Sequence, residues 1–488
     1  MVGVPGRSKG CATCRKRKKG CDLQRPACGQ CTKSGLQCAG YERQCIFINH
    51  AAAASPNALV TTSQAAGPSQ TPRPRPTRAF DLPPRGIVLP DALTRSVYEL
   101  KSLGLFWETY LPLGRAFTAF QGQFTTGSWL GAVDCLYHRD DTLKHALLAM
   151  SLGTVGQRLG DPWMIQQGIA CHGRALRAMA LAVQSPDISR REEVLVAARF
   201  LALLEMLFGA NDQDKFAQAR SWSSHVEGEL ILLKARGPHA HMSGLAHRLF
   251  ADGRLSTIIS AIRSRRRTVL SNPEWKEVPW LAMPKTPKDA LLDIMVEIPA
   301  VLENLDSIEG ARSQQEKHLL AERVLQSCWA LDVQLTEWVL NINAVASLDL
   351  DSLAHVADTG DIAIAHIIYL YWVTCMLVSR TLALANEDCV EPQLLPPRFD
   401  ERVYARKIAR SASYFFQKEM GIWSANASSF PIGIALSVLC DAAKQGGEDR
   451  ELIMSVLCQG ETGDAVSKFL NSMRAWYKVA QCRLRGPP

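Results

Sequence analysis

The sequence predicts a mainly α-helical protein in three parts: a small cysteine-rich metal module at residues 1–45, a flexible linker at 46–86 and a large all-helical domain at 87–488. Three observations lead to this prediction. Six cysteines with a repeated spacing occupy the first part, and Ala, Ser, Thr and Pro dominate the second. In the third part apolar residues recur at the helical spacing, whereas alternating segments bounded by hairpin turns are scarce.

The first part contains the spacing C-x2-C-x6-C twice, with six residues between the two copies. Zinc prefers four thiolates in a tetrahedron, so six thiolates serve two zinc ions only if two sulfurs bridge. Because the two halves have equal spacing, the first cysteines of the two halves, Cys11 and Cys28, are the natural bridging pair. The predicted ligands of two structural Zn²⁺ ions are Cys11, Cys14, Cys21, Cys28, Cys31 and Cys38.

A disulfide framework is the alternative for these six cysteines. It would require an oxidising compartment, and the amino-terminal segment MVGVPGRSKG lacks the apolar run of a secretory signal. Cys45 lies outside the repeat and is expected to be a spare thiol. The cysteines of the third part show no metal spacing, so we expect them to be small buried apolar residues.

The positive charge of the chain is concentrated in the first part. Residues 1–45 hold ten Lys or Arg against two acidic residues, which accounts for the whole net charge of +8. The other 443 residues carry 45 basic and 45 acidic groups. Six thiolates and two Zn²⁺ would leave the module at about +6. Such a density of positive charge on a small domain is typical of a nucleic-acid binder, which is attracted to phosphates.

The first half of the cysteine repeat also predicts a short helix. We expect it to run from Ala12 to Lys19 and to end at Gly20 in a left-handed conformation, with Gly35 ending the helix of the second half in the same way. A basic run lies along this helix and at its exit. Its members, the candidate DNA-binding residues, are Arg15, Lys16, Arg17, Lys18 and Lys19.

The segment GCATCRKRKKGCDLQRPACGQCTKSGLQCAGY resembles the fungal zinc binuclear cluster family, Zn2Cys6, at every cysteine. The resemblance implies a fungal source, a nuclear location and a transcription factor of RNA polymerase II that binds double-stranded DNA. It implies that Lys18 reads a CGG triplet with help from Arg17, while Arg15, Lys16 and Lys19 contact phosphate. Gly20 departs from the family, which often has Lys or Arg before the third cysteine.

Residues 49–85 have the composition of a linker. They are rich in Ala, Ser, Thr and Pro, and too few large apolar residues recur to bury a core. Many members of the family dimerise through a coiled coil directly after the cluster. No sustained heptad pattern follows it here, so a homodimer stays open but a zipper is not expected.

The third part is long enough for a large buried core, and its helix signals are explicit. Thr142 is the expected N-cap of one helix, Asp161 followed by Pro162 opens the next, and Ser189 with Glu192 forms an expected capping box. The expected buried stripe of the second of these helices comprises Ile165, Ile169, His172, Leu176, Met179 and Val183.

Three stretches of this part, beginning at HALLAMSLGTVGQRLGDPWMIQQGIACHGRALRAMALAV, resemble the second type of fungal-specific transcription factor domain. This resemblance implies an all-helical regulatory domain that contacts transcriptional co-regulators. Factors of this layout govern a secondary-metabolite gene cluster or a metabolic pathway. The alternative is a ligand-sensing regulator whose helical domain binds a small metabolite.

Several other signals favour structural interpretations. The apolar run from Ile362 to Val378 is expected to be a buried core helix, not a membrane span. His172 is expected to be a satisfied core histidine, and the basic group at residues 263–267 a solvated helix face in preference to an import signal or phosphate site. Residues 348–361 fit an activation segment or an interhelical loop. Enzyme motifs are not found, so catalysis is not expected.

Overall fold

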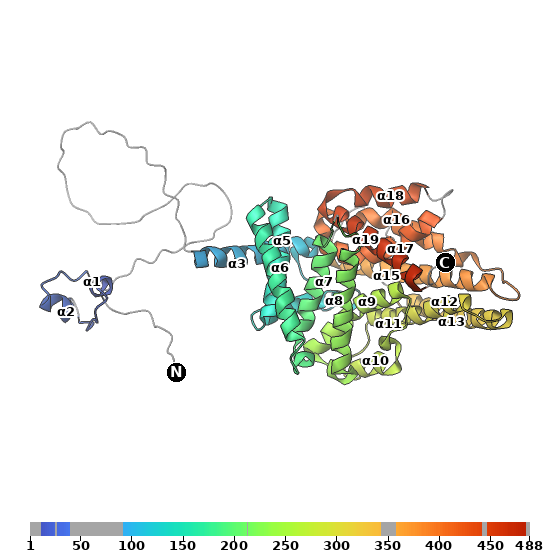
Figure 1. Ribbon diagram of the computed structural model, residues 1–488, viewed down its shortest axis with the longest axis horizontal. Coiled ribbons are helices and arrows are strands. Elements are labelled where there is room, and N and C mark those ends of the chain that lie inside the picture. The colour runs from blue at the N-terminus through green and yellow to red at the C-terminus, as the bar shows by residue number, and fades with distance from the viewer. Residues whose placement is uncertain are drawn as a thin grey trace, which may run out of the picture. The chain divides into compact units, whose positions relative to one another are not determined.

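The computed structural model describes residues 11–24, 27–39, 91–211, 213–342, 358–441 and 447–484. Contacts divide the chain into two units, residues 1–85 and 86–488 (Figure 1). The described residues of both units form helices and no strands, which confirms the predicted fold class. The expected linker at 46–86 lies entirely outside the described residues, and so does Cys45.

The first unit contains two short helices, α1 (Ala12–Lys16) and α2 (Gly29–Lys33). The expectation that α1 reaches Lys19 and ends at a left-handed Gly20 is wrong. Lys18 takes the left-handed conformation instead, with φ of 52°, and the Lys19 N–H donates to the Cys14 carbonyl at 3.1 Å. An equivalent bond ends α2, where the Leu36 N–H donates to the Cys31 carbonyl. Gly35 is left-handed there, as expected.

The second unit begins with long helices that pack in neighbouring pairs. Helix α5 packs against α3 and α6, and α7 packs against α5 and α8. The side chain of Asp140, not that of Thr142, caps α5, because it accepts from the Thr142 and Leu143 N–H groups at 2.7 and 3.2 Å. These helices are α3 (Asp91–Tyr110), α4 (Val133–Leu136), α5 (Asp141–Leu159), α6 (Pro162–Ala182), α7 (Glu192–Phe208) and α8 (Ala217–Arg236).

Helix α6 starts as predicted, with Asp161 as N-cap and Pro162 in the first turn, but the expected buried stripe is wrong. Ile169 is 64% exposed and Val183 is 54% exposed. The face that meets α5 includes Gly168, where an added Cβ would lie only 2.9 Å from the Gly153 nitrogen of α5. The close approach of the two backbones therefore decides which side of α6 is buried.

Helix α7 does not begin with the expected capping box. Its N-cap is Arg191, which makes no side-chain capping bond, and a 3₁₀ turn (Ile188–Arg190) precedes it. The apolar run that follows is nevertheless buried, from Val194 to Met206. Burial of an apolar helix on all sides thus compensates for a start without a side-chain cap.

The remaining helices complete the apolar core of the second unit. Helix α15 lies against α13, α16 and α17, and α17 contacts α18 and α19 (Figure 1). Their bounds are α9 (Gly244–Ser264), α10 (Pro273–Glu277), α11 (Pro287–Met295), α12 (Ile298–Glu309), α13 (Gln314–Asn341), α15 (Thr359–Glu387), α16 (Glu401–Phe415), α17 (Trp423–Asp441), α18 (Gly447–Leu457) and α19 (Gly460–Leu484).

Two of these helices are long and apolar enough to cross a membrane by composition alone, α15 and residues 423–440 of α17. Their most apolar windows are 83% and 72% buried inside the unit. His366 on α15 is fully buried, with its Nδ1 2.8 Å from the Thr125 hydroxyl. The prediction of a core helix at Ile362–Val378 is therefore confirmed.

Candidate metal centre and nucleic-acid interface

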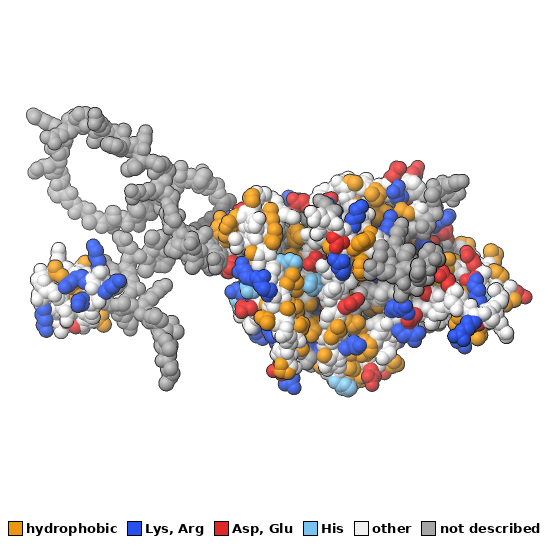
Figure 2. All heavy atoms as spheres, viewed as in Figure 1, with side chains coloured by type: hydrophobic (Ala, Val, Ile, Leu, Met, Phe, Trp, Pro, Cys, Tyr) orange, Lys and Arg blue, Asp and Glu red, His pale blue; other side chains and the backbone are white. Residues whose placement is uncertain are grey.

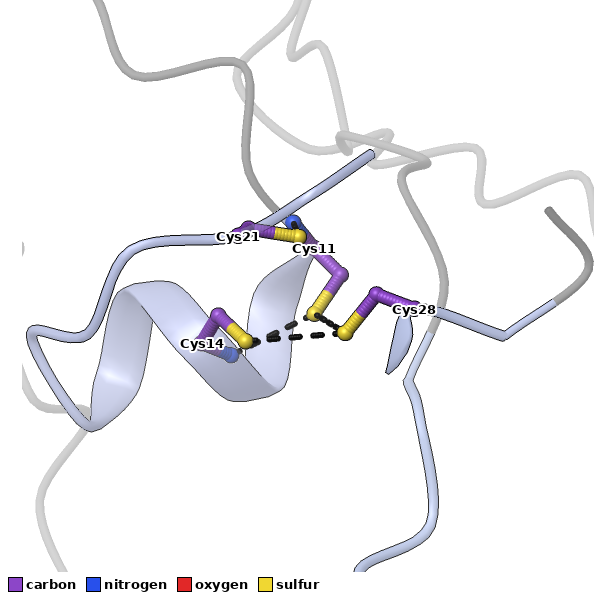
Figure 3. A group of neighbouring side chains, drawn as sticks. All are labelled: Cys11, Cys14, Cys21 and Cys28. Carbon is purple, nitrogen blue, oxygen red and sulfur yellow. Dashed lines mark hydrogen bonds between the residues drawn. The ribbon is translucent and has the colours of Figure 1, made fainter. Parts of the chain in front are cut away.

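All six predicted cysteines of the first unit come together in two overlapping groups of four sulfurs. Within each group the sulfur atoms lie within 4.8 Å of one another. Figure 3 shows one group, in which the sulfurs of Cys11, Cys14 and Cys28 turn toward each other. The groups are Cys11, Cys14, Cys21 and Cys28, and then Cys11, Cys28, Cys31 and Cys38. Only Cys11 and Cys28 belong to both groups.

The sulfur separations fit the dimensions of zinc–thiolate coordination. A tetrahedron with Zn–S bonds of about 2.3 Å has S···S edges of about 3.8 Å. The Cys11 sulfur lies 3.6 Å from that of Cys28 and 3.7 Å from that of Cys31. The sulfurs of Cys14 and Cys28 are 3.6 Å apart. The six cysteines are free of disulfides and have a metal-binding arrangement that is consistent with two structural zinc ions.

The two shared cysteines occupy the same place in each half of the module. Cys11 directly precedes α1, and its sulfur accepts from the Cys14 N–H at 3.3 Å. Cys28 is the N-cap of α2, and its sulfur accepts from the Cys31 N–H at 3.3 Å. The positive end of each short helix therefore faces a sulfur of the cage, which favours the thiolate form of that sulfur.

The crowding of these thiols is unfavourable unless a cation compensates it. Burial, together with a hydrogen bond to the neighbouring Cys11 sulfur, raises the pKa of Cys14 to about 12. Burial also raises the pKa of Cys28. Because a metal ligand must be a thiolate, a bound dication would supply the charge that holds these sulfurs deprotonated. The donor set therefore fits zinc better than it fits six free thiols.

Three residues that the sequence analysis did not single out tie the two halves together. The Thr13 hydroxyl donates to the Gln37 carbonyl at 3.1 Å and accepts from the Ala39 N–H at 2.9 Å. The Asp22 carboxylate accepts from the Gly29 N–H at 3.0 Å, at the start of α2. A Cβ at Gly29 would collide with that carboxylate. The only sequence signal for this contact was an acidic residue beside a ligand cysteine, facing a helix start.

The candidate DNA-binding residues lie where α1 ends. The side chains of Lys16, Arg17, Lys18 and Lys19 are all exposed, while that of Arg15 lies outside the described side chains. Figure 2 shows blue Lys and Arg side chains over much of the visible face of the small unit. The module thus presents cations directly beside the sulfur cage, an arrangement that can bind a polyanion.

The geometry and the comparisons agree on the class of this module. Residues 9–45 match the fungal Zn(2)-Cys(6) binuclear cluster domain. Residues 9–45 are therefore a domain of the fungal binuclear cluster type, and the predicted resemblance of this segment is confirmed.

Individual relatives match short stretches of the chain. The Arginine metabolism regulation protein II of Saccharomyces cerevisiae is 55% identical over 40 residues, which are 8% of this chain and 4% of that protein. The Sterol uptake control protein 2 of Candida albicans is 62% identical over 32 residues, 7% of this chain and 4% of that protein. An uncharacterized protein of Emericella nidulans is 26% identical over 131 residues, 27% of each chain.

These alignments cover about a quarter or less of each relative's length. No solved structure matches the chain. The expected second-type fungal transcription factor domain receives no support from these matches, and it stays a prediction.

The other signals of the second unit have structural partners. Arg265 pairs with Asp306 at 2.5 Å, while Arg266 and Arg267 pair with Glu303 at 3.2 and 2.6 Å. The basic group at 263–267 therefore faces the acidic side of α12 as well as solvent.

His172 is only partly buried, in contrast to the prediction of a core histidine. Its Nε2 lies 3.5 Å from the Glu205 carboxylate, so it does have a polar neighbour.

Proposed function

We propose that the chain is a sequence-specific regulator of RNA polymerase II transcription that acts in the nucleus. Its zinc module binds promoter DNA containing a CGG element. The observation that carries the proposal is a family-matched sulfur cage whose first helix leads directly into exposed Lys16, Arg17, Lys18 and Lys19. Cations fixed beside a rigid cage attract the phosphates of duplex DNA and can reach base edges in the major groove.

The role of zinc in this proposal is structural. Each ion would be held by four thiolates, so no coordination position remains open for a substrate or a water molecule. The proposed ligands are the six cysteines of the two sulfur groups, with Cys11 and Cys28 shared. A bound ion joins the two halves of a unit that is too small to hold itself together by apolar burial.

The basic residues would divide into two roles. Lys18, where the chain leaves α1, would donate to the O6 and N7 atoms of guanine, and Arg17 would assist it. Arg15, Lys16 and Lys19 would contact phosphate, which positions the module without selecting a sequence. The run at 15–19 would also serve as the nuclear import signal.

The regulated pathway is proposed only in outline. The printed names of two relatives mention arginine metabolism and sterol uptake, which are unrelated processes, so similarity of the cluster does not identify a pathway. We propose control of a secondary-metabolite gene cluster or a metabolic pathway, with the helical unit contacting transcriptional co-regulators. Either a monomer or a homodimer is compatible with this proposal.

The decisive experiment compares two duplexes that differ only in the CGG triplet. Fluorescence anisotropy with the full-length, zinc-loaded chain should show at least about tenfold tighter binding to the CGG duplex, because each wrong base pair costs about 1–3 kcal/mol. The affinity for both duplexes should fall steeply with salt. Equal affinity for the two duplexes across that salt range would contradict sequence-specific recognition of CGG.

A further inference from the structure

A cavity of about 430 Å³ lies among six helices of the second unit. Its walls come from α9, α12, α15, α17, α18 and α19, several of which form the orange and red part of the ribbon in Figure 1. This volume is within the range of sites that take small organic ligands, about 300–1,000 Å³. All of its lining residues belong to the second unit, and none is a residue of the proposed DNA interface.

Most of the cavity wall is apolar. Long aliphatic and aromatic side chains from all six helices contribute to it, and these include Leu302, Leu377, Phe430, Ile434, Met454 and Leu470. Gly433 on α17 adds a stretch of bare backbone, since any Cβ there would lie 2.8 Å from the Leu470 side chain. A ligand of this cavity would therefore place a hydrocarbon body against the wall.

The charged part of the wall is basic. Arginines from α9, α15, α18 and α19, and one directly after α9, contribute to it, and no Asp or Glu occurs among the described lining residues. The arginines are Arg263, Arg265, Arg380, Arg450 and Arg474. Helices far apart in the sequence thus bring positive charge to one largely apolar space.

Two of these arginines are available for a ligand. Arg265 pairs with Asp306, and Arg380 lies 3.9 Å from Glu401. Arg450 and Arg474 are exposed, and neither makes an ion pair with any side chain that the structure describes. The Arg474 guanidinium donates to the sulfur of Cys440 at 3.8 Å. A guanidinium in this position can bind a carboxylate through two parallel hydrogen bonds.

A neighbouring cavity shows that this charge pattern is particular to the first one. The neighbour has a volume of about 620 Å³ and shares Arg263 and Arg265 with it. Its wall holds four arginines but also the four carboxylates of Glu227, Glu303, Asp306 and Glu309. Its charges therefore balance internally, whereas those of the 430 Å³ cavity call for an anion from outside.

We propose that the 430 Å³ cavity binds a small amphipathic carboxylic acid. The hydrocarbon part of the ligand lies against the leucines and Phe430, and its carboxylate lies toward Arg450 and Arg474. Inorganic anions lack the apolar body that the wall accommodates, and uncharged hydrocarbons lack a group for the arginines. This inference concerns the helical unit alone and does not depend on DNA binding by the zinc module.

Isothermal titration of the full-length, zinc-loaded chain tests the proposal with decanoate, decan-1-ol and acetate as probes. We expect saturable binding of decanoate, at least about tenfold weaker binding of decan-1-ol, and no binding of acetate. The Arg450→Gln/Arg474→Gln double variant should weaken decanoate binding at least about tenfold. Because both side chains are exposed, its unliganded melting temperature should stay within about 1 °C of the wild type.

The control is Arg323→Gln, which removes an exposed arginine of α13 that does not line the cavity and should leave decanoate binding unchanged. Any of three results overturns the proposal: no saturable binding of decanoate, equal affinity for decanoate and decan-1-ol, or wild-type decanoate affinity in the folded double variant. Since the readout is ligand binding, each of these results leaves the proposed recognition of CGG unaffected.

Discussion

The two units of this chain are stabilised by different chemistry. Among the described residues of the zinc module, the buried cluster consists of Cys11, Cys14, Cys28 and Cys31 alone. The helical unit instead buries a continuous apolar core that reaches from Phe106 to Met473. A fold whose buried residues are metal ligands depends on the metal, whereas a fold with an extended apolar core does not. Perturbations should therefore separate the two units cleanly.

Zinc removal should have the largest effect, and it should be confined to the module. Chelation should abolish DNA binding by the full-length chain, because structural zinc contributes about 10–16 kcal/mol to the folding of small zinc modules. Melting of the helical unit, followed by circular dichroism at 222 nm, should not change. A loss of helical stability on chelation would show that the two units are not independent.

Single cysteine variants sharpen this comparison. Cys28→Ser should lower the zinc content more than Cys38→Ser, because Cys28 belongs to both sulfur groups and Cys38 to one. Native mass spectrometry gives the zinc stoichiometry directly. Cys135→Ser, at an exposed cysteine of the helical unit, is the control and should keep two zinc ions. Equal zinc loss in the Cys28 and Cys38 variants would contradict a shared role for Cys28.

The buried ion pair of Lys288 and Asp252 should give the largest effect in the helical unit. The Lys288 ammonium lies 2.5 Å from the Asp252 carboxylate, and both side chains are almost fully buried. Lys288→Met leaves that carboxylate without its partner, so urea unfolding should show a loss of about 3–5 kcal/mol. Lys276→Met, which breaks the partly exposed pair with Glu297, should cost no more than about 1 kcal/mol.

The same pair predicts how this loss depends on pH. Burial alone would raise the pKa of Asp252, but the charge and hydrogen bond of Lys288 outweigh burial and lower it below its ordinary value of 3.8. A carboxyl group whose pKa is lowered in the folded state stabilises the fold at pH values above its pKa in the unfolded state. This contribution is lost as the pH falls through the folded-state pKa. The stability gap between wild type and Lys288→Met should therefore narrow below pH 3.8. A gap that widens in acid would contradict this assignment.

Glycine-to-alanine substitutions in α6 should have smaller effects on the stability of the helical unit, and the sign should depend on whether the glycine lies against α5. Gly168→Ala places a Cβ 2.9 Å from the backbone of Gly153, so it should destabilise the unit by about 1–3 kcal/mol. Gly173→Ala, five residues on in the same helix, meets only the flexible end of Arg177 at 3.6 Å. It should stabilise by about 0.5–1 kcal/mol through helix propensity. Thermal melts of the two variants test this. Melting temperatures that shifted in the same direction would contradict the proposed close contact.

These helices also show what the sequence could and could not predict. Spacing alone predicted the six cysteines and the pair common to both sulfur groups, because tetrahedral coordination limits how six thiolates can serve two ions. The predicted buried face of α6 was wrong, because periodicity marks large apolar residues, whereas the contact with α5 uses Gly168 and its small neighbours. Glycine at a helix interface looks the same in sequence as glycine that only weakens a helix.

The end of α1 was missed for a related reason. Gly20 was the residue best suited to a left-handed conformation. The position of the left-handed residue is set instead by its separation along the chain from the second cysteine of each half. Lys18 follows Cys14 by four residues, as Gly35 follows Cys31, and both positions are left-handed. The repeat of the cysteines therefore predicts the turn better than residue preference does, because each helix must end where its chain returns to the metal site.

The left-handed Lys18 allows a small effect on stability to be separated from an effect on DNA recognition. Lys18→Gly removes the proposed base-reading side chain. It also relieves the cost of about 1 kcal/mol that a non-glycine residue bears in the left-handed conformation. The module should keep or gain stability against chelation while its preference for the CGG duplex falls at least about tenfold. Lys16→Gln should weaken binding to both duplexes alike, by about one counterion of salt slope.

Gly35→Ala provides the reverse test in the second half of the module. It keeps every basic residue but places a Cβ in the equivalent left-handed position, where φ is 63°. Resistance to chelation should fall by about 1 kcal/mol, and the ratio of affinities for the CGG and altered duplexes should not change. Anisotropy titrations at one salt concentration measure that ratio for all three variants. If Lys18→Gly preserved the ratio while Gly35→Ala lowered it, the cage geometry and not the Lys18 side chain would be the source of specificity.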